Sequence, residues 1–185
     1  MIQRPVYVVD EIGTIVSAVS TRLLSQLQVI DSNITGVHYQ FGHIEEIKET
    51  LAQKDQSEAF IYTKYPLVIL VQDFSETMGA GLGIATTDNL HILIVTSTSG
   101  NYKAAERYAA TFKPILYPIY LAFLDEIAKS GRVMTSSVNQ LKHNKIDRVY
   151  WGKEAAQGNT KNIFNDRLDA IEITNLNLKF YQPVC

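Results

Sequence analysis

The chain has 185 residues, a formal net charge of −2 at pH 7, 46% hydrophobic residues and 19% charged residues. These values are ordinary for a globular protein and exclude a disordered or fibrous class, and the length fits one domain spanning residues 1–185. The single cysteine, Cys185, cannot form an internal disulfide, and we expect no signal peptide and no membrane span, which favours synthesis in a reducing cytosol.

The first quarter of the chain predicts a helix, a strand and a second helix. Residues 10–29 place apolar side chains three and four positions apart, as on one face of an amphipathic helix. Residues 34–41 are rich in strand-forming side chains, and residues 44–54 predict a short helix with one apolar stripe. His38 and His43 lie close in sequence, but their spacing matches no metal-ligand pattern, so we expect no metal there.

The centre of the chain predicts a long-looped β-hairpin. Residues 64–74 contain five consecutive apolar residues after Pro66, a run that is too short for a buried helix. Residues 89–98 predict a second strand with apolar side chains on both faces, so we expect the chain's own core on both sides or a neighbouring subunit on one. The glycine-rich stretch 79–83 leads into a strand and not into a helix, which favours a hairpin loop over a nucleotide-binding turn.

The longest helix is predicted at residues 102–129, where apolar side chains recur at helical spacing. Pro114 and Pro118 each remove a backbone donor, so we expect a kink or a short break between two helical halves. Gly131 is predicted to close the second half.

A polar, basic arm is predicted at residues 130–166. Six basic residues lie between positions 129 and 153, with Asp147 as the one acid and with Tyr150 and Trp151 among them. This composition is typical of a protein interface and also of DNA binding, and a solvated loop with its aromatic side chains on the core is the third interpretation. The basic residues are Lys129, Arg132, Lys142, Lys145, Arg148 and Lys153.

The last strand is predicted at residues 169–181. Its apolar residues lie at odd positions up to Ile173 and at even positions from Leu176, and this change of phase near Thr174 and Asn175 predicts a bulge. The whole order predicts an α+β fold: a mixed or antiparallel β-sheet packed by an N-terminal helix and a long, proline-kinked helix. A β-hairpin loop and the polar arm precede the last strand.

The residues suggest no catalytic site. The cysteine is terminal, the four histidines are scattered, and no Gly-x-Ser-x-Gly sequence is present. Asp166, Asp169 and Glu172 are spaced as on a helix but fall in or before a predicted strand, so we interpret them as surface acids. We therefore expect no enzyme, no cofactor and no metal, and a small enzyme remains only the third hypothesis.

The order of elements resembles the tail-terminator and head–tail completion proteins of tailed bacteriophages. The resemblance includes the strand entry at 65–70 (Tyr-Pro-Leu-Val-Ile-Leu) and the closing strand at 169–173 (Asp-Ala-Ile-Glu-Ile). Segments 102–108 (Tyr-Lys-Ala-Ala-Glu-Arg-Tyr) and 158–166 (Gly-Asn-Thr-Lys-Asn-Ile-Phe-Asn-Asp) look more specifically like proteins of phages of gut Bacteroidetes, including ring proteins of crAss-like phage tails.

The resemblance implies a structural virion protein, located in the phage neck or tail and in the host cytoplasm during assembly. Such proteins form closed rings of about six or twelve copies between the portal and the distal tail, contact adjacent ring proteins, and contribute to the conduit for genomic DNA. No catalytic residues carry over, because the family has none to transfer. The alternative is an adaptor that binds DNA or protein through residues 129–153.

A ring also offers a use for the uneven charge of the chain. Residues 1–100 carry a balance of −6 and residues 101–185 a balance of +4, which suits head-to-tail contact if the two halves form two sides; simple solvated surfaces are the other interpretation. The candidate interface residues lie in the glycine-rich loop and the arm. They are Met78, Gly79, Gly81, Lys142, Lys145, Arg148, Tyr150, Trp151 and Lys153.

Overall fold

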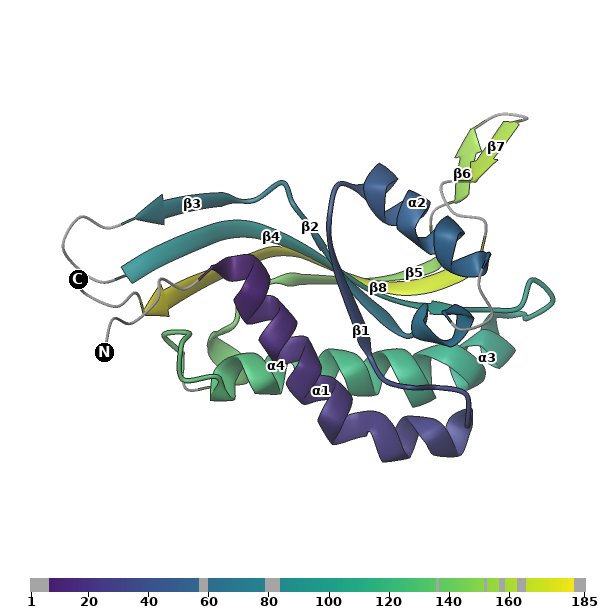
Figure 1. Cartoon of the computed structure of the whole chain (residues 1–185), viewed down its shortest axis with the longest axis horizontal. Coiled ribbons are helices and arrows are strands. Elements are labelled where there is room, and N and C mark those ends of the chain that lie inside the picture. Colours follow the sequence, from purple (N-terminus) through teal and green to yellow (C-terminus); the bar gives the residue numbers. More distant parts are fainter. Residues whose placement is uncertain are drawn as a thin grey trace.

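The computed structural model describes residues 7–56, 60–78, 84–135, 137–151, 153–156, 159–162 and 166–181. They form the predicted α+β fold, in which helices pack against a mixed six-stranded sheet (Figure 1). The strands of this sheet are β1 (His38–Gly42), β2 (Leu67–Val71), β3 (Ser75–Met78), β4 (Ile84–Ser97), β5 (Asn144–Trp151) and β8 (Leu168–Tyr181). Their order is β1-β2-β4-β8-β5, and β3 pairs with the first part of β4.

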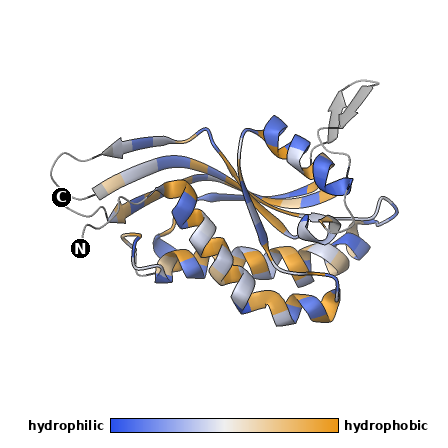
Figure 2. Cartoon of the chain, viewed as in Figure 1, coloured by the Kyte–Doolittle hydropathy of each residue, from blue (hydrophilic) through white to orange (hydrophobic). Residues whose placement is uncertain are grey.

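Helices cover both faces of the sheet (Figure 1). The first helix and the long helix lie on one face, and the short second helix lies on the other. Figure 2 shows hydrophobic residues alternating with hydrophilic ones along the first and long helices. None of the described helices has the length and apolar character needed to cross a membrane. The helices are α1 (Val8–Ile30), α2 (Ile44–Asp55), α3 (Ala104–Arg107), the π-helix η2 (Tyr108–Leu116) and α4 (Tyr117–Lys129), with 3-10 turns η1 (Ile61–Thr63) and η3 (Val138–Gln140).

Alternation along the central strands explains the two covered faces. In β2, Val68 and Leu70 belong to the core against α1 and α4, whereas Leu67 and Ile69 belong to the core against α2. In β4, Leu93 packs toward α2, between neighbours that pack toward α1 and α4. The apolar residues on both faces are therefore covered by the chain's own helices, the first of the two expected arrangements.

The predicted hairpin is present but longer than expected. β2 and β4 pair antiparallel, with Leu67 opposite Val95. The residues after β2 were expected to belong to the long loop of the hairpin, yet Ser75–Met78 forms β3 and pairs with the first part of β4, which begins at Ile84. Pairing with β4 overrides the polar composition of Ser75–Met78, because a strand neighbour satisfies its backbone groups. The loop 79–83 lies outside the described residues.

The long helix is continuous over 26 residues, so the short break does not occur. Pro114 lies inside η2, where the backbone N–H of Tyr117 donates to the carbonyl of Phe112, five residues earlier. This wider turn accommodates Pro114, which has no backbone N–H to donate. Pro118 lies in the first turn of α4. Gly131 follows the helix with φ +69°, which confirms its predicted closing role.

Part of the predicted arm is built into the sheet. Asn144–Trp151 is the edge strand β5, which pairs antiparallel with β8. Beyond it, β6 (Lys153–Ala156) and β7 (Asn159–Asn162) form a separate two-stranded sheet, which Figure 1 places at the end of the molecule opposite β3. The segment 130–166 therefore combines an edge strand with a small ribbon.

The bulge in the last strand is confirmed. The pairing of β4 with β8 shifts register twice between Thr87 and Ile92, and Asn175 has φ +56°. Ile173 and Leu176, on either side of the shift, both face the core against α1 and α4.

Candidate functional site

The predicted interface residues of β5 do not share one surface. Lys145 faces the long helix, where its Nζ lies 4.7 Å from the centre of the Tyr117 ring and forms an ion pair with Asp147. Arg148 faces the opposite side of the sheet, where its Nε donates to Glu172 Oε2 over 2.6 Å. A strand places successive side chains on opposite faces, so residues that are near neighbours in sequence are separated in space.

The two aromatic residues of the arm also diverge. Tyr150 has φ +52° at a register shift between β5 and β8, and its ring lies over the Arg107 guanidinium, with 3.9 Å from Cζ to the ring centre. Trp151 packs against the core on the α2 side. Both side chains are half-buried and contribute to the fold of this end of the sheet.

The other predicted interface residues that the structure describes lie in different elements. Lys142 is exposed before β5, and Lys153 begins β6. Met78 ends β3, and Gly79 and Gly81 lie outside the described residues.

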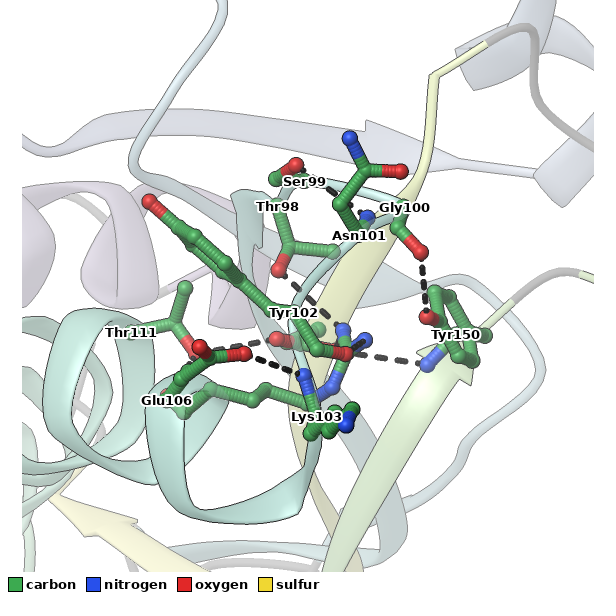
Figure 3. Close-up of polar contacts among 11 residues, drawn as sticks. Thr98, Ser99, Gly100, Asn101, Tyr102, Lys103, Glu106, Thr111 and Tyr150 are labelled. Atoms are coloured by element: carbon green, nitrogen blue, oxygen red, sulfur yellow. Dashed lines mark hydrogen bonds and ion pairs between the residues drawn. The ribbon is translucent and has the colours of Figure 1, made fainter.

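A buried ion pair between Arg107 and Asp169 lies in contact with the arm residue Tyr150. Arg107 is 3% exposed and Asp169 is 0% exposed, and Arg107 Nη1 donates to Asp169 Oδ1 over 2.7 Å. Nη1 also donates to Thr98 Oγ1, and Nη2 donates to the Tyr102 carbonyl. Figure 3 shows these contacts between the end of β4, the start of the long helix and β8.

Asp169 accepts two further hydrogen bonds, and these fix the position of the arm. Thr111 Oγ1 donates to Oδ2 over 2.9 Å, and the backbone N–H of Tyr150 donates to Oδ1 over 3.3 Å (Figure 3). The Tyr150 hydroxyl donates to the Gly100 carbonyl. We call Thr98, Tyr102, Arg107, Thr111, Tyr150 and Asp169 the Arg107 cluster. Its charges already have partners, so its evident role is to hold η2, β5 and β8 together.

An apolar groove lies beside the Arg107 cluster, between η2 and β5. It has a volume of about 320 Å³. Tyr108 and Val149 on its rim are each more than half exposed, and the Tyr117 ring lies within 6.1 Å of both the Tyr108 and the Phe112 ring centres. We call this the aromatic groove and define it by Tyr102, Tyr108, Phe112, Tyr117, Val149 and Tyr150. Exposed aromatic rings in a hollow are suited to binding an apolar side chain.

The Tyr117 hydroxyl on the rim of the aromatic groove has a raised pKa. The Tyr117 hydroxyl donates to Asp147 Oδ2 over 2.7 Å; this hydrogen bond first, then burial and the nearby negative charge, raise the pKa of Tyr117 to about 12. The pKa of a tyrosine in the unfolded chain is about 10. The contribution of the Tyr117 hydroxyl to folding stability is therefore complete below pH 10 and is lost as the pH rises through about 12. Asp147→Asn will lower the pKa of Tyr117 toward 10, measured by NMR of ring-labelled tyrosine with Tyr117→Phe for assignment.

Asp73→Asn is the matched control, because Asp73 is exposed just after β2. It will leave the pKa of Tyr117 unchanged. An unchanged pKa in Asp147→Asn would contradict the role given to that carboxylate.

The interpretation of Asp166, Asp169 and Glu172 as surface acids is wrong for Asp169 and Glu172, whereas the Asp166 side chain is 33% exposed. Asp169 is buried with Arg107, and Glu172 lies between His91 Nε2 at 2.9 Å and Arg148. Asp166 accepts hydrogen bonds from the Tyr65 hydroxyl and the buried Lys64, and Lys64 also pairs with Asp55. Acids on the covered parts of a sheet are retained when each has a cationic partner.

The histidine positions match no metal site. His43 Nδ1 accepts from the backbone N–H of Glu45 and caps α2. His38 Nε2 lies 3.2 Å from the Thr35 hydroxyl. Within the described parts of the chain, no group of three or more His, Cys, Asp or Glu residues could hold a metal ion.

Neither a protein-family model nor a curated protein matches the chain.

The sequence contains one signal for the Arg107 cluster, the position of Asp169 in the last strand. Asp169 has the same odd-numbered phase as Ile171 and Ile173, so it lies on the apolar face of the strand. An acid on that face predicts a buried cationic partner, although it does not say which residue that partner is.

Proposed function

We propose that this protein is a structural virion component, a ring protein of the neck or tail of a tailed bacteriophage. The observation that carries the proposal is the shape of the sheet: β3 and the paired ends of β4 and β8 extend past the first turn of α1 (Figure 1). A β-extension beyond the helices offers contact surface for neighbouring subunits and for the rings above and below.

The distribution of charge supports a conduit over a DNA-binding adaptor. The basic residues Lys145 and Arg148 face opposite sides of β5, and each pairs with a carboxylate. A DNA-binding protein presents basic side chains on one surface, where they contact phosphates. A conduit has the opposite requirement, because strong phosphate binding would hold back the passing genome.

The acidic half of the sequence (1–100) and the basic half (101–185) do not form two separate sides of the molecule. The difference in charge between the halves therefore cannot drive head-to-tail contact in a ring. β4 from the acidic half and β8 from the basic half pair along their length. Ion pairs also join the halves, as between Arg22 and Asp125 and between Lys64 and Asp166. Contacts between copies must therefore use local surfaces.

Native mass spectrometry of the purified protein will give a closed ring of about six or twelve copies. Proteomics of purified phage particles will detect the protein in the tail fraction. A protein that stays monomeric and is absent from virions would refute the proposal. DNA affinity that falls steeply with salt, and is lost in Lys142→Glu/Lys145→Glu/Arg148→Glu, would support the adaptor instead.

A further inference from the structure

The sheet has two open edges that face away from each other. β1 lies at one edge and β5 at the other, and among the described residues no strand pairs with the outer side of either. Each edge leaves backbone donors and acceptors without a strand partner, which makes it a template for an added strand. A protein that assembles with copies of itself has a direct use for such a pair of edges.

The strand directions determine how the edges can meet. β1 is parallel to β2, and each further step across the sheet to β4, β8 and β5 is antiparallel. β1 and β5 therefore run in opposite directions. Rotation of a copy about an axis along the strands preserves these directions, so β5 of one copy meets β1 of the next as an antiparallel pair.

We propose that β1 of one copy adds to β5 of the next in this antiparallel manner, with Phe41 seated in the aromatic groove. Phe41 is 50% exposed and lies opposite Leu70, so it points to the same side of the sheet as α1 and α4. Asp147 lies opposite Ile171 and faces the same side, beside the aromatic groove. Paired residues of neighbouring strands share a face, so Phe41 enters the groove when it lies opposite Asp147.

This register also places Gln40 opposite Arg148 of the next copy. Gln40 lies opposite Ile69 and Arg148 lies opposite Ala170, so both side chains lie on the α2 side of the joined sheet.

Local charge selects head-to-tail contact over contact between identical edges. Segment 38–50, around β1, has three glutamates and one lysine, a balance of −2. Segment 142–151, around β5, has three basic residues and one aspartate, a balance of +2, which becomes +1 when Glu172, the β8 partner of Arg148, is included. Two β1 edges or two β5 edges would bring like charges together, whereas β1 against β5 brings opposite charges together.

Cross-linking between single-cysteine variants tests the contact directly. In a Cys185→Ser background, Thr50→Cys marks the β1 edge, because Thr50 lines a hollow with Gln40 and Phe41, and Ile146→Cys marks the α2-facing side of β5. A short bismaleimide will link the two variants when they are mixed and will not link either variant alone. Ser25→Cys on the exposed side of α1, mixed with Ile146→Cys, is the control and will give no product.

A second variant tests the groove. Phe41→Ser will weaken the contact between copies by about 10- to 100-fold, as expected for loss of one buried aromatic side chain, measured by analytical ultracentrifugation. Phe60→Ser is the matched control, since Phe60 is 56% exposed but lies outside both edges, and it will leave association unchanged.

The inference of an edge contact rests on the proposed function, because it takes its ring geometry from there. The outcomes of these experiments distinguish failure of the edge contact from failure of the proposed function. Rings that form without the mixed cross-link, or that tolerate Phe41→Ser, would overturn the edge contact and leave the ring proposal standing. Self-linking of Ile146→Cys or Thr50→Cys alone would also overturn it, in favour of contact between identical edges. A mixed cross-link in a protein that is absent from virions would support the edge contact and refute the virion role.

Discussion

Asp169→Ala will lower the free energy of unfolding by about 3–5 kcal/mol, measured by urea unfolding followed by circular dichroism. The substitution leaves the Arg107 guanidinium buried, and its remaining acceptors among the described residues are the neutral oxygens of Thr98 and Tyr102. It also removes the acceptor for the Tyr150 backbone N–H and one of the two acceptors of the Thr111 hydroxyl, which can still donate to the Arg107 carbonyl. A loss of this size is large against a total stability of about 5–15 kcal/mol.

Two comparisons separate the buried charge from a general effect of mutation. Arg107→Met/Asp169→Leu removes both charges and will be more stable than Asp169→Ala alone, because no unpaired charge remains buried. Lys48→Ala removes an exposed ion pair with Glu45 in α2 and will cost about 0.5 kcal/mol or less. Stability of Asp169→Ala within about 1 kcal/mol of the original protein would contradict the anchoring role of the Arg107 cluster.

Phe123→Ala will lower the free energy of unfolding by about 3–5 kcal/mol, through lost apolar contacts and the cavity left behind. Phe123 is fully buried on α4, in the core that α1 and α4 form with the sheet. The same urea titration measures the change, with the protein concentration held constant, because association between copies adds to apparent stability.

Leu121→Ala is the control on the same helix. Leu121 is 61% exposed, and its truncation will cost about 0.5 kcal/mol or less. Equal losses for Phe123→Ala and Leu121→Ala would mean that the long helix does not pack on the sheet through the face described.

Periodicity predicted the elements that have a clear apolar pattern. The three- and four-residue spacing of α1 and the apolar run of β2 were sufficient because each is buried along its length. The strand β5 was missed because it is an edge strand. Its residues Asn144–Arg148 are exposed and mix both charge signs, so no hydrophobic pattern marks them.

The candidate site was predicted less well than the fold. The stretch around Tyr150 and Trp151 was identified, but the strand alternation that sends Lys145 and Arg148 to opposite faces depends on recognising β5 as a strand. The ion pair of Arg107 with Asp169 joins residues 62 positions apart in the chain. No local pattern specifies such a partner, because the contact exists only after β8 and α3 pack together.

The sequence by itself determined which segments form the major helices and central strands, and it placed the bulge near Asn175 in β8. These features follow from local geometry: side-chain periods of 3.6 and 2 and the change of phase along one strand. The tertiary structure decided which charges pair, how the long helix accommodates Pro114, and that β1 and β5 are the open edges of the sheet. Those features depend on contacts between distant segments, and the proposed assembly rests on them.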